Sequence, residues 1–219
     1  MAEFEFELTG NGYTLKKYNG SAPDVNIPSS YNGKNVIAIG PYAFYFNEAV
    51  KGVTIPKTVT RLERHAFKNS SIVSIAVPNS VTYIGYGAFD CCFALISVKL
   101  PETIKEIERQ TFNGCSNLVD VNIPKTVTKI GENAFSSCRS LEKVTVPASV
   151  TFMNDAFLYC SELKRAVFVD PNGWYLAYRA EDDFGDDISD EDLAYPPLAA
   201  KLLKTRNTYG VIWKKRQRK

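Results

Sequence analysis

The sequence predicts a mainly β solenoid of six to seven rungs, because two separate marks recur along it with one period. A proline preceded by a β-branched residue or leucine recurs at spacings of 28, 22, 23, 23 and 23 residues, and a phenylalanine at spacings of 23, 22, 23, 23 and 22. The marks are Pro28, Pro56, Pro78, Pro101, Pro124 and Pro147, and Phe44, Phe67, Phe89, Phe112, Phe135 and Phe157. A fixed period of this length is typical of stacked repeats, none of which buries its apolar face alone.

One short strand is expected in each rung. Val121 and Ile123 are two residues apart, which is the period of a strand, and Pro124 then ends the strand because it has no N–H for the ladder. The apolar residues that follow are three apart, which favours short extended and 3₁₀ segments. Stacking such rungs places equivalent strands ~4.8 Å apart around a continuous core.

The unit at 121–138, VNIPKTVTKIGENAFSSC, resembles the leucine-rich repeat of the BspA-like family, LxxVxIPxxVxxIGxxAFxxC, which is about 23 residues long. The resemblance covers roughly residues 21–169. It implies a right-handed leucine-rich-repeat solenoid that serves as a protein–protein interaction module, and in bacterial members adhesion to host or microbial proteins. Glu63 and Glu108 stand where other units have Gly, and unit six has MND at 153–155 and is one residue short, so we expect kinked rungs at these three places.

Three segments are predicted: an N-terminal β-hairpin cap at 1–20, the repeat solenoid at 21–169, and a C-terminal cap at 170–219. In the first, Phe4, Phe6 and Leu8 alternate with glutamates before a TGNG turn, which indicates a hairpin. An edge strand pair without a capping role is the alternative. An open solenoid needs such caps because it exposes core at both ends.

The C-terminal segment is predicted to contain an acidic loop, a short helix, a strand and a basic tail, and it is similar to the tail of some bacterial members. Eight of the twelve residues 181–192 are acidic, and a helix is expected at 193–203, with Ser189 or Asp190 near its N-cap. Pro196 and Pro197 argue that the helix begins there. A strand is expected at 209–213, and Trp174 and Trp213 are expected to pack over the last rung.

Charge and composition exclude several classes of protein. Hydrophobic residues make up 45% and the net charge is +2, which argues against a disordered chain and against a general electrostatic footprint for nucleic acid or membrane. No apolar run reaches the ~18 residues of a membrane span, and residues 1–12 lack a signal pattern. We therefore expect a cytoplasmic location for the chain as given, or the cell surface if a leader or anchor was trimmed.

The five cysteines are interpreted as core residues. Cys92, Cys115, Cys138 and Cys160 each follow the Phe mark by three residues, so they form one column of small apolar fillers. Buried free thiols are favoured over disulfides and over a metal site, because a single column does not converge on an ion. His65 belongs to a column of varied residues, which we interpret as solvent-facing.

No catalytic, cofactor or metal motif is found, so we expect a non-enzymatic chain without cofactors and with no metal site. The outward residues of the strands remain, and the concave face that they form is the predicted protein-binding surface of a monomer. Its residues are Asp24, Asn26, Thr54, Ser74, Ser97, Lys99, Asp120, Asn122, Lys143, Thr145 and Arg165. The alternative is a nucleic-acid or acidic-ligand binder that acts through the basic tail at 214–219, which we consider unlikely.

Overall fold

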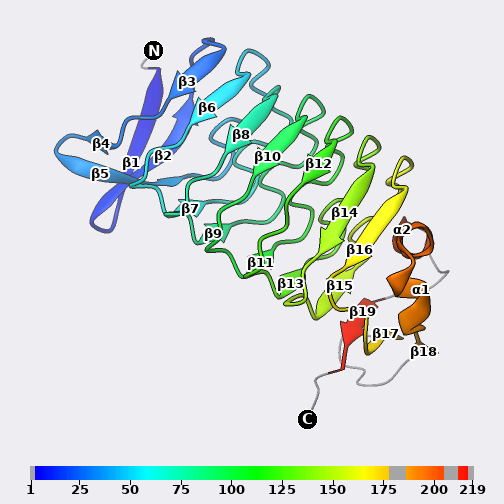
Figure 1. Ribbon diagram of the computed structural model, residues 1–219. Coiled ribbons are helices and arrows are strands. Elements are labelled where there is room, and N and C mark those ends of the chain that lie inside the picture. The colour runs from blue at the N-terminus through cyan, green and yellow to red at the C-terminus, as the bar shows by residue number, and fades with distance from the viewer. Residues whose placement is uncertain (1–2, 178–185, 205–211, 217–219) are drawn as a thin grey trace.

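The computed structural model describes residues 3–177, 186–204 and 212–216, and it has the form of an elongated solenoid with little helix (Figure 1). Successive turns of the chain, called coils below, are stacked side by side from the N-terminal hairpin to the C-terminal helices. The mainly β solenoid predicted from the double period is therefore confirmed, with seven coils.

A front ladder of parallel strands follows the solenoid, hydrogen-bonded as a five-stranded sheet and, after one interruption, a two-stranded sheet. It consists of β3 (Asp24–Asn26), β6 (Gly52–Thr54), β8 (Ser74–Ala76), β10 (Ser97–Lys99), β12 (Asp120–Val121), β14 (Lys143–Val146) and β16 (Arg165–Phe168). Equivalent residues are in register, so that Val98 pairs with Ile75 on one side and with Val121 on the other. These valine and isoleucine side chains point into the core, and their neighbours in the strand point outward.

A rear ladder of shorter strands closes the other side of each coil. It contains β5 (Lys34–Ile39), β7 (Arg61–Leu62), β9 (Tyr83–Ile84), β11 (Glu106–Ile107), β13 (Lys129–Ile130) and β15 (Phe152–Asn154). At Gly85 and Gly131 an added Cβ would lie 2.8 and 2.6 Å from a backbone nitrogen of the preceding coil. Glu108 carries a Cβ at this tight position, and among these strands the pairing is interrupted beside it, between β9 and β11. At Glu63 and at 153–155 the pairing with the preceding rear strand is kept, so only one of the three expected irregularities is observed.

Stacked phenylalanine rings form the centre of the core. Phe67, Phe89, Phe112, Phe135 and Phe157 are fully buried, and their ring centroids follow one another at 5.2 to 5.3 Å with nearly parallel planes. Phe44 begins the stack, 4.8 Å from Phe67. The repeated phenylalanine is thus a continuous column in which each ring packs between two others.

Two turn positions in each coil adopt left-handed backbone conformations. One column consists of Tyr42, His65, Gly87, Gln110, Asn133 and Asp155, and the other of Phe46, Asn69, Cys91, Gly114, Ser137 and Tyr159, all with φ between +45° and +72°. Such φ values cost a non-glycine residue about 1–2 kcal/mol. The coil geometry imposes them, and the residue type at each position varies around that requirement.

The N-terminal hairpin covers the first end of the phenylalanine column. It consists of β1 (Phe4–Thr9) and the antiparallel β2 (Gly12–Tyr18), and β2 adds to the rear ladder beside β5. The Tyr18 ring stacks 5.3 Å from Phe44 and is in turn covered by Phe4 at 5.1 Å. The predicted hairpin is confirmed, although Leu8 near its tip is exposed.

The extra residues of the first unit form a small excursion beside the N-terminal hairpin. Ser30 and Tyr31 make up β4 (Ser30–Tyr31), which pairs with the start of β5 around a turn at Asn32 and Gly33. The Tyr31 ring stacks 4.6 Å from Phe6. The insertion therefore strengthens the contact between the hairpin and the first coil.

The C-terminal segment packs on the last coil. It contains β17 (Trp174–Ala177), β18 (Asp186–Asp187), α1 (Asp190–Ala194), α2 (Pro196–Lys204) and β19 (Ile212–Lys215). The rings of Trp174 and Trp213 lie 5.4 and 6.0 Å from Phe168, which confirms their predicted place over the last rung. Figure 1 shows α1 and α2 beside β16, at the open edge of the front ladder.

The helix predicted at 193–203 is wrong in its extent. Two helices are present, and Tyr195 between them has an extended backbone (ψ 100°), because the residue before a proline is disfavoured in the α region. Ser189 is the N-cap of α1, as expected, and α2 begins at Pro196. The predicted strand at 209–213 overlaps β19 at Ile212 and Trp213, and β19 continues to Lys215. Residues 209–211 of the predicted strand lie outside the described part of the chain.

Asp170 connects the last coil to the C-terminal segment. Its carboxylate lies 2.6 Å from Lys215 Nζ and accepts hydrogen bonds from Asn172, while its carbonyl oxygen accepts from Trp174 Nε1. Lys215 is only 10% exposed, so the ion pair is partly shielded from water. Since this junction and Tyr18 each close one end of the core, we propose that the division 1–20, 21–169 and 170–219 separates two caps from the solenoid.

The junction gives a pH-dependent prediction. Hydrogen bonds from Lys215 and Asn172 lower the pKa of Asp170 from 3.8 to about 2, so its stabilising effect is present above about pH 4 and is lost as the pH falls towards 2. We expect Asp170→Ala to lower stability at pH 7 by about 1 kcal/mol, or roughly 2–4 °C in Tm, and to have little effect near pH 2. Thermal unfolding at both values tests this, with Glu102→Ala as the exposed control; an equal loss at both pH values would contradict the role of the ion pair.

Candidate protein-binding surface

The outward side chains of the front ladder form one continuous surface, called the strand face below. All eleven residues predicted for protein binding are exposed on it, from Asp24 in β3 to Arg165 in β16. They are held by a backbone whose register repeats from coil to coil, so they form parallel columns along the solenoid. The structure thus brings the predicted residues together on one side of the molecule.

Part of the strand face is recessed. A hollow of about 460 Å³ lies over β3, β6, β8 and β10, and Asp24, Thr54, Ser74, Ser97 and Lys99 contribute to its lining. Gly52 widens it, because an added Cβ there would lie 2.7 Å from the Asp24 carboxylate. The recess occupies the N-terminal half of the face.

The C-terminal half of the strand face carries longer, basic side chains and a second hollow. Lys143 lies 3.9 Å from the Asp120 carboxylate, and both side chains are more than half exposed, so this pair is weak and open to other partners. A more apolar hollow of about 340 Å³ lies at the ends of β12, β14 and β16, with Asn122 and Thr145 beside Pro147 and Val169. The two halves of the face therefore differ in shape as well as in charge.

An apolar rim beside the strand face was missed from the sequence. Val73, Ile96 and Val119 each precede the first strand residue of their coil and stack on one another through Ile96 N–Val73 O (2.8 Å) and Val119 N–Ile96 O (3.1 Å) hydrogen bonds. Ile96 and Val119 are 48% and 46% exposed, and Phe93 nearby is 57% exposed. Exposed apolar groups gathered in this way indicate an interaction site. The signal available in the sequence was an apolar residue at this repeat position in three successive units.

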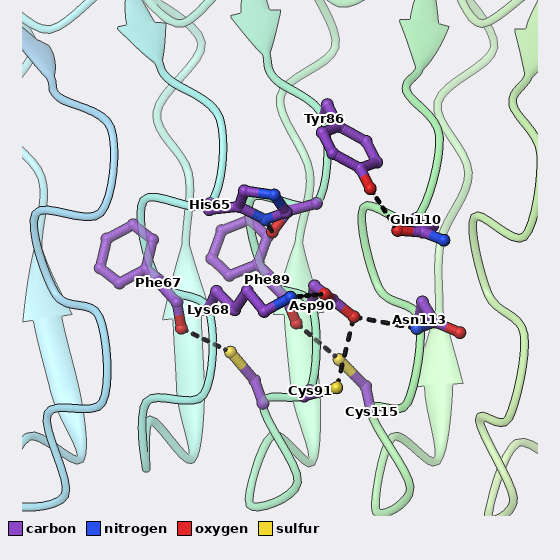
Figure 2. Close-up of polar contacts among 12 residues, drawn as sticks. His65, Phe67, Lys68, Tyr86, Phe89, Asp90, Cys91, Gln110, Asn113 and Cys115 are labelled. Atoms are coloured by element: carbon purple, nitrogen blue, oxygen red, sulfur yellow. Dashed lines mark hydrogen bonds and ion pairs between the residues drawn. The ribbon is translucent and has the colours of Figure 1, made fainter.

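His65 is not solvent-facing, which corrects the prediction. Its side chain is 7% exposed, its ring lies between Tyr42 (5.2 Å) and Tyr86 (4.7 Å), and Nδ1 is 3.3 Å from the Gly87 carbonyl oxygen (Figure 2). Burial lowers the pKa of His65. The residues of its column share a left-handed backbone and differ in exposure, from the buried His65 and Gly87 to Tyr42, which is 39% exposed.

A polar cluster lies beside His65 between three coils (Figure 2). Asp90, which is 3% exposed, accepts from Lys68 Nζ at 2.7 Å, from Asn113 Nδ2 at 2.9 Å and from the Cys91 thiol at 3.4 Å. Burial and the neighbouring carboxylate raise the pKa of Cys91 to about 11, which keeps the thiol protonated. A nucleophilic cysteine needs the opposite shift, so the cluster is a structural clamp between coils.

The cysteine column is buried and contains free thiols, as predicted. Its role differs from simple filling, since each thiol donates a hydrogen bond to a phenylalanine carbonyl oxygen of the preceding coil, at 3.0 to 3.2 Å (Figure 2). Burial raises the pKa of Cys92 and Cys160 to about 12, and it also raises the pKa of Cys115 and Cys138 well above the usual value of a thiol. Among the residues that the structure describes, no group of His, Cys, Asp or Glu side chains could hold a metal ion.

The basic tail is partly engaged within the C-terminal segment. Lys215 pairs with Asp170, and the Arg216 guanidinium lies 5.4 Å from the centre of the Tyr175 ring. Residues 217–219 lie outside the described part of the chain. Within the described ranges, no helix has the length and apolar character needed to cross a bilayer.

Comparison with known families identifies the repeats. A family model described as the BspA type leucine-rich repeat region matches residues 37–164 in six copies. The chain belongs to this family. The BspA-type repeats account for the coils from β5 to the residues just before β16.

Solved structures agree with this assignment. The chain is 30% identical to a leucine-rich repeat protein of T. pallidum, with a TM-score of 0.51, over 75% of this chain and 68% of that one. It is 25% identical to a leucine-rich repeat protein of Eubacterium ventriosum, with a TM-score of 0.55, over 66% of this chain and 45% of that one. The pneumococcal vaccine antigen PcpA shares the fold at 18% identity and a TM-score of 0.50, over 76% and 59% of the two chains. None of the curated proteins compared with this BspA-type chain matches it.

The buried thiol column predicts slow chemistry at all five cysteines. Four are fully buried and the pKa of every thiol is raised, so few thiolates form at pH 8. We expect fewer than about one thiol per chain to react with an aromatic disulfide reagent in the native state within minutes, and all of them after unfolding in guanidinium. Rapid native labelling of all five, or a mass deficit that indicates paired sulfurs, would contradict the structure.

Proposed function

We propose that this chain is a non-enzymatic protein-binding module whose partner contacts the strand face. The observation that carries the proposal is the coherence of this surface: side chains from seven coils are exposed on one side of the solenoid, with a recess in one half and longer side chains in the other. Membership of the BspA-type family supports it, since such repeats typically serve as binding modules.

The chemistry of the surface also favours binding over catalysis. The thiols are protonated, Asp90 is engaged by Lys68, and the exposed columns carry small polar groups spread along the molecule. Catalysis requires an activated group and its base within hydrogen-bond reach of one reacting atom. A surface that is extended and repetitive suits contact with another extended surface.

Adhesion of a bacterial surface to host or microbial proteins is the setting that the family resemblance implies, and we include it in the proposal. A module of this kind would present the strand face outward while the caps protect both ends of the core. The charge difference between Asp24 at one end and Arg165 at the other would orient a partner along the solenoid.

Substitutions on the strand face test the proposal. Binding to a panel of purified host and microbial surface proteins is measured by biolayer interferometry for the wild type and for Asn122→Trp combined with Lys143→Glu. Both positions are exposed, so we expect partner binding to weaken at least tenfold while Tm changes by no more than about 2 °C, as is usual for surface substitutions.

Two control variants complete the experiment. Thr82→Trp is an exposed substitution on the rear side and should leave binding unchanged. Neutralising Lys214, Arg216, Arg218 and Lys219 retains the Lys215–Asp170 pair and removes the other basic charges of the tail. Binding that survives the strand-face substitutions and is lost with the tail charges would contradict the proposal and favour an acidic ligand at the tail.

A further inference from the structure

Residues of opposite charge flank the apolar rim on the two sides of Ile96. The rim position is occupied in successive coils by Pro23, Lys51, Val73, Ile96, Val119, Glu142 and Lys164. A rotation that reverses the order of the coils about Ile96 places Val73 opposite Val119 and Lys51 opposite Glu142, while Pro23 lies opposite Lys164. The rim is therefore complementary to a reversed copy of itself from Lys51 to Glu142.

The first column of the strand face has opposite charges at its two ends. β10 is the fourth of the seven front strands, so a reversal about Ser97 exchanges the two ends of the face (Figure 1). Asp24 then lies opposite Arg165, Gly52 lies opposite Lys143, and Ser74 lies opposite Asp120. Each column thus contains one pair of opposite charges, Lys51 with Glu142 and Asp24 with Arg165.

Shape follows the same symmetry. The recessed half of the face lies around Gly52 and Asp24, and the half that would be turned onto it carries the long side chains of Lys143 and Arg165. The Lys143 side chain is 66% exposed, so it is free to extend into such a recess. A carboxylate already lines that recess and would receive the ammonium group.

We infer that the strand face binds a second copy of this chain, with a twofold axis that runs along β10. The inference rests on the proposed function of the face as a protein interface and names its partner, and it replaces the monomer expected from the sequence with a dimer. An axis along the strands keeps each column opposite the same column of the second copy, which is the isologous contact typical of twofold dimers.

The composition of the surface fits such a contact. Ile96 and Val119 supply exposed apolar groups near the axis, and the Asp24–Arg165 and Lys51–Glu142 pairs lie towards the periphery, as in protein interfaces generally. Seven coils at ~4.8 Å span about 30 Å, which is compatible with roughly 800 Å² buried on each copy. Lys99 would face its own equivalent near the axis, and its long stem lets the ammonium turn towards an Asp120 carboxylate.

Charge exchange provides the test. Sedimentation equilibrium of the full chain over a wide concentration range at low ionic strength is expected to show a monomer–dimer equilibrium for the wild type. Lys51→Glu and Glu142→Lys should each weaken it at least tenfold, because two symmetric pairs become repulsive. An equimolar mixture of the two variants should form a heterodimer, since each places its altered residue opposite an opposite charge, and the double variant should regain the wild-type constant.

Further variants separate this contact from misfolding and from other binding. Ile96→Asp should abolish the dimer by placing two carboxylates at the axis, whereas the exposed substitutions Leu8→Asp and Lys34→Glu, which lie outside the face, should leave it intact. Circular dichroism and Tm verify that each variant folds. A wild type that stays monomeric at all concentrations overturns the second copy as partner and leaves panel binding as a separate test of the face. Dimerisation that ignores both Ile96→Asp and the charge reversals overturns the strand face as the contact.

Discussion

The structure depends on the stacking of each coil against equivalent groups of its neighbours. No coil buries its own phenylalanine: the rings of Phe89, Phe112 and Phe135 are covered by one another at 5.2 to 5.3 Å. The same neighbour relation supplies the hydrogen bonds, since Phe112 N donates to Ala134 O (2.8 Å) and the Cys138 thiol donates to Phe112 O (3.2 Å). Apolar packing and polar satisfaction thus impose one common spacing on the chain, which is why the period is so constant.

This constraint separates the positions that must be kept from those that are free to vary. The core columns and the left-handed turns are fixed by contact with the adjacent coils, and the clamp around Asp90 joins three of them. The outward strand residues are exposed to solvent and are less constrained by the adjacent coils. Their side chains can therefore vary without changing the scaffold that carries them. The ends need separate solutions: Tyr18 covers Phe44 at the start of the column, and Trp174 covers Phe168 in the last coil.

The sequence predicted the features that follow directly from periodicity. The solenoid, the buried thiol column and the exposure of residues such as Asn122 depend only on position within the repeat, and all are found in the structure. His65 was wrongly predicted to face solvent. The varied residue types of its column were interpreted as a sign of exposure, whereas His65 occupies a left-handed turn and lies between aromatic rings. The thiol donors were missed because the carbonyl groups that they satisfy belong to the preceding coil and leave no trace in the residue pattern.

Other differences arise at places where the repeat does not apply. The helix break at Tyr195 arises because the residue before a proline is disfavoured in the α region. The apolar rim at Ile96 arises because two successive residues, Ile96 and Ser97, are both exposed where the strand begins. Whether the eleven strand-face residues bind a protein remains a prediction, since exposure brings them together without supplying a partner.

The stability of the ring column is the most direct test of this account. Phe112→Ala removes one ring from the middle of the stack, and chemical denaturation should show a loss of about 3–5 kcal/mol, the cost of a large cavity in a tightly packed core. Phe46→Ala removes the same ring from an exposed turn and should cost far less. A loss below about 1 kcal/mol at Phe112, or equal losses at the two positions, would contradict the claim that coil-on-coil stacking holds the solenoid together.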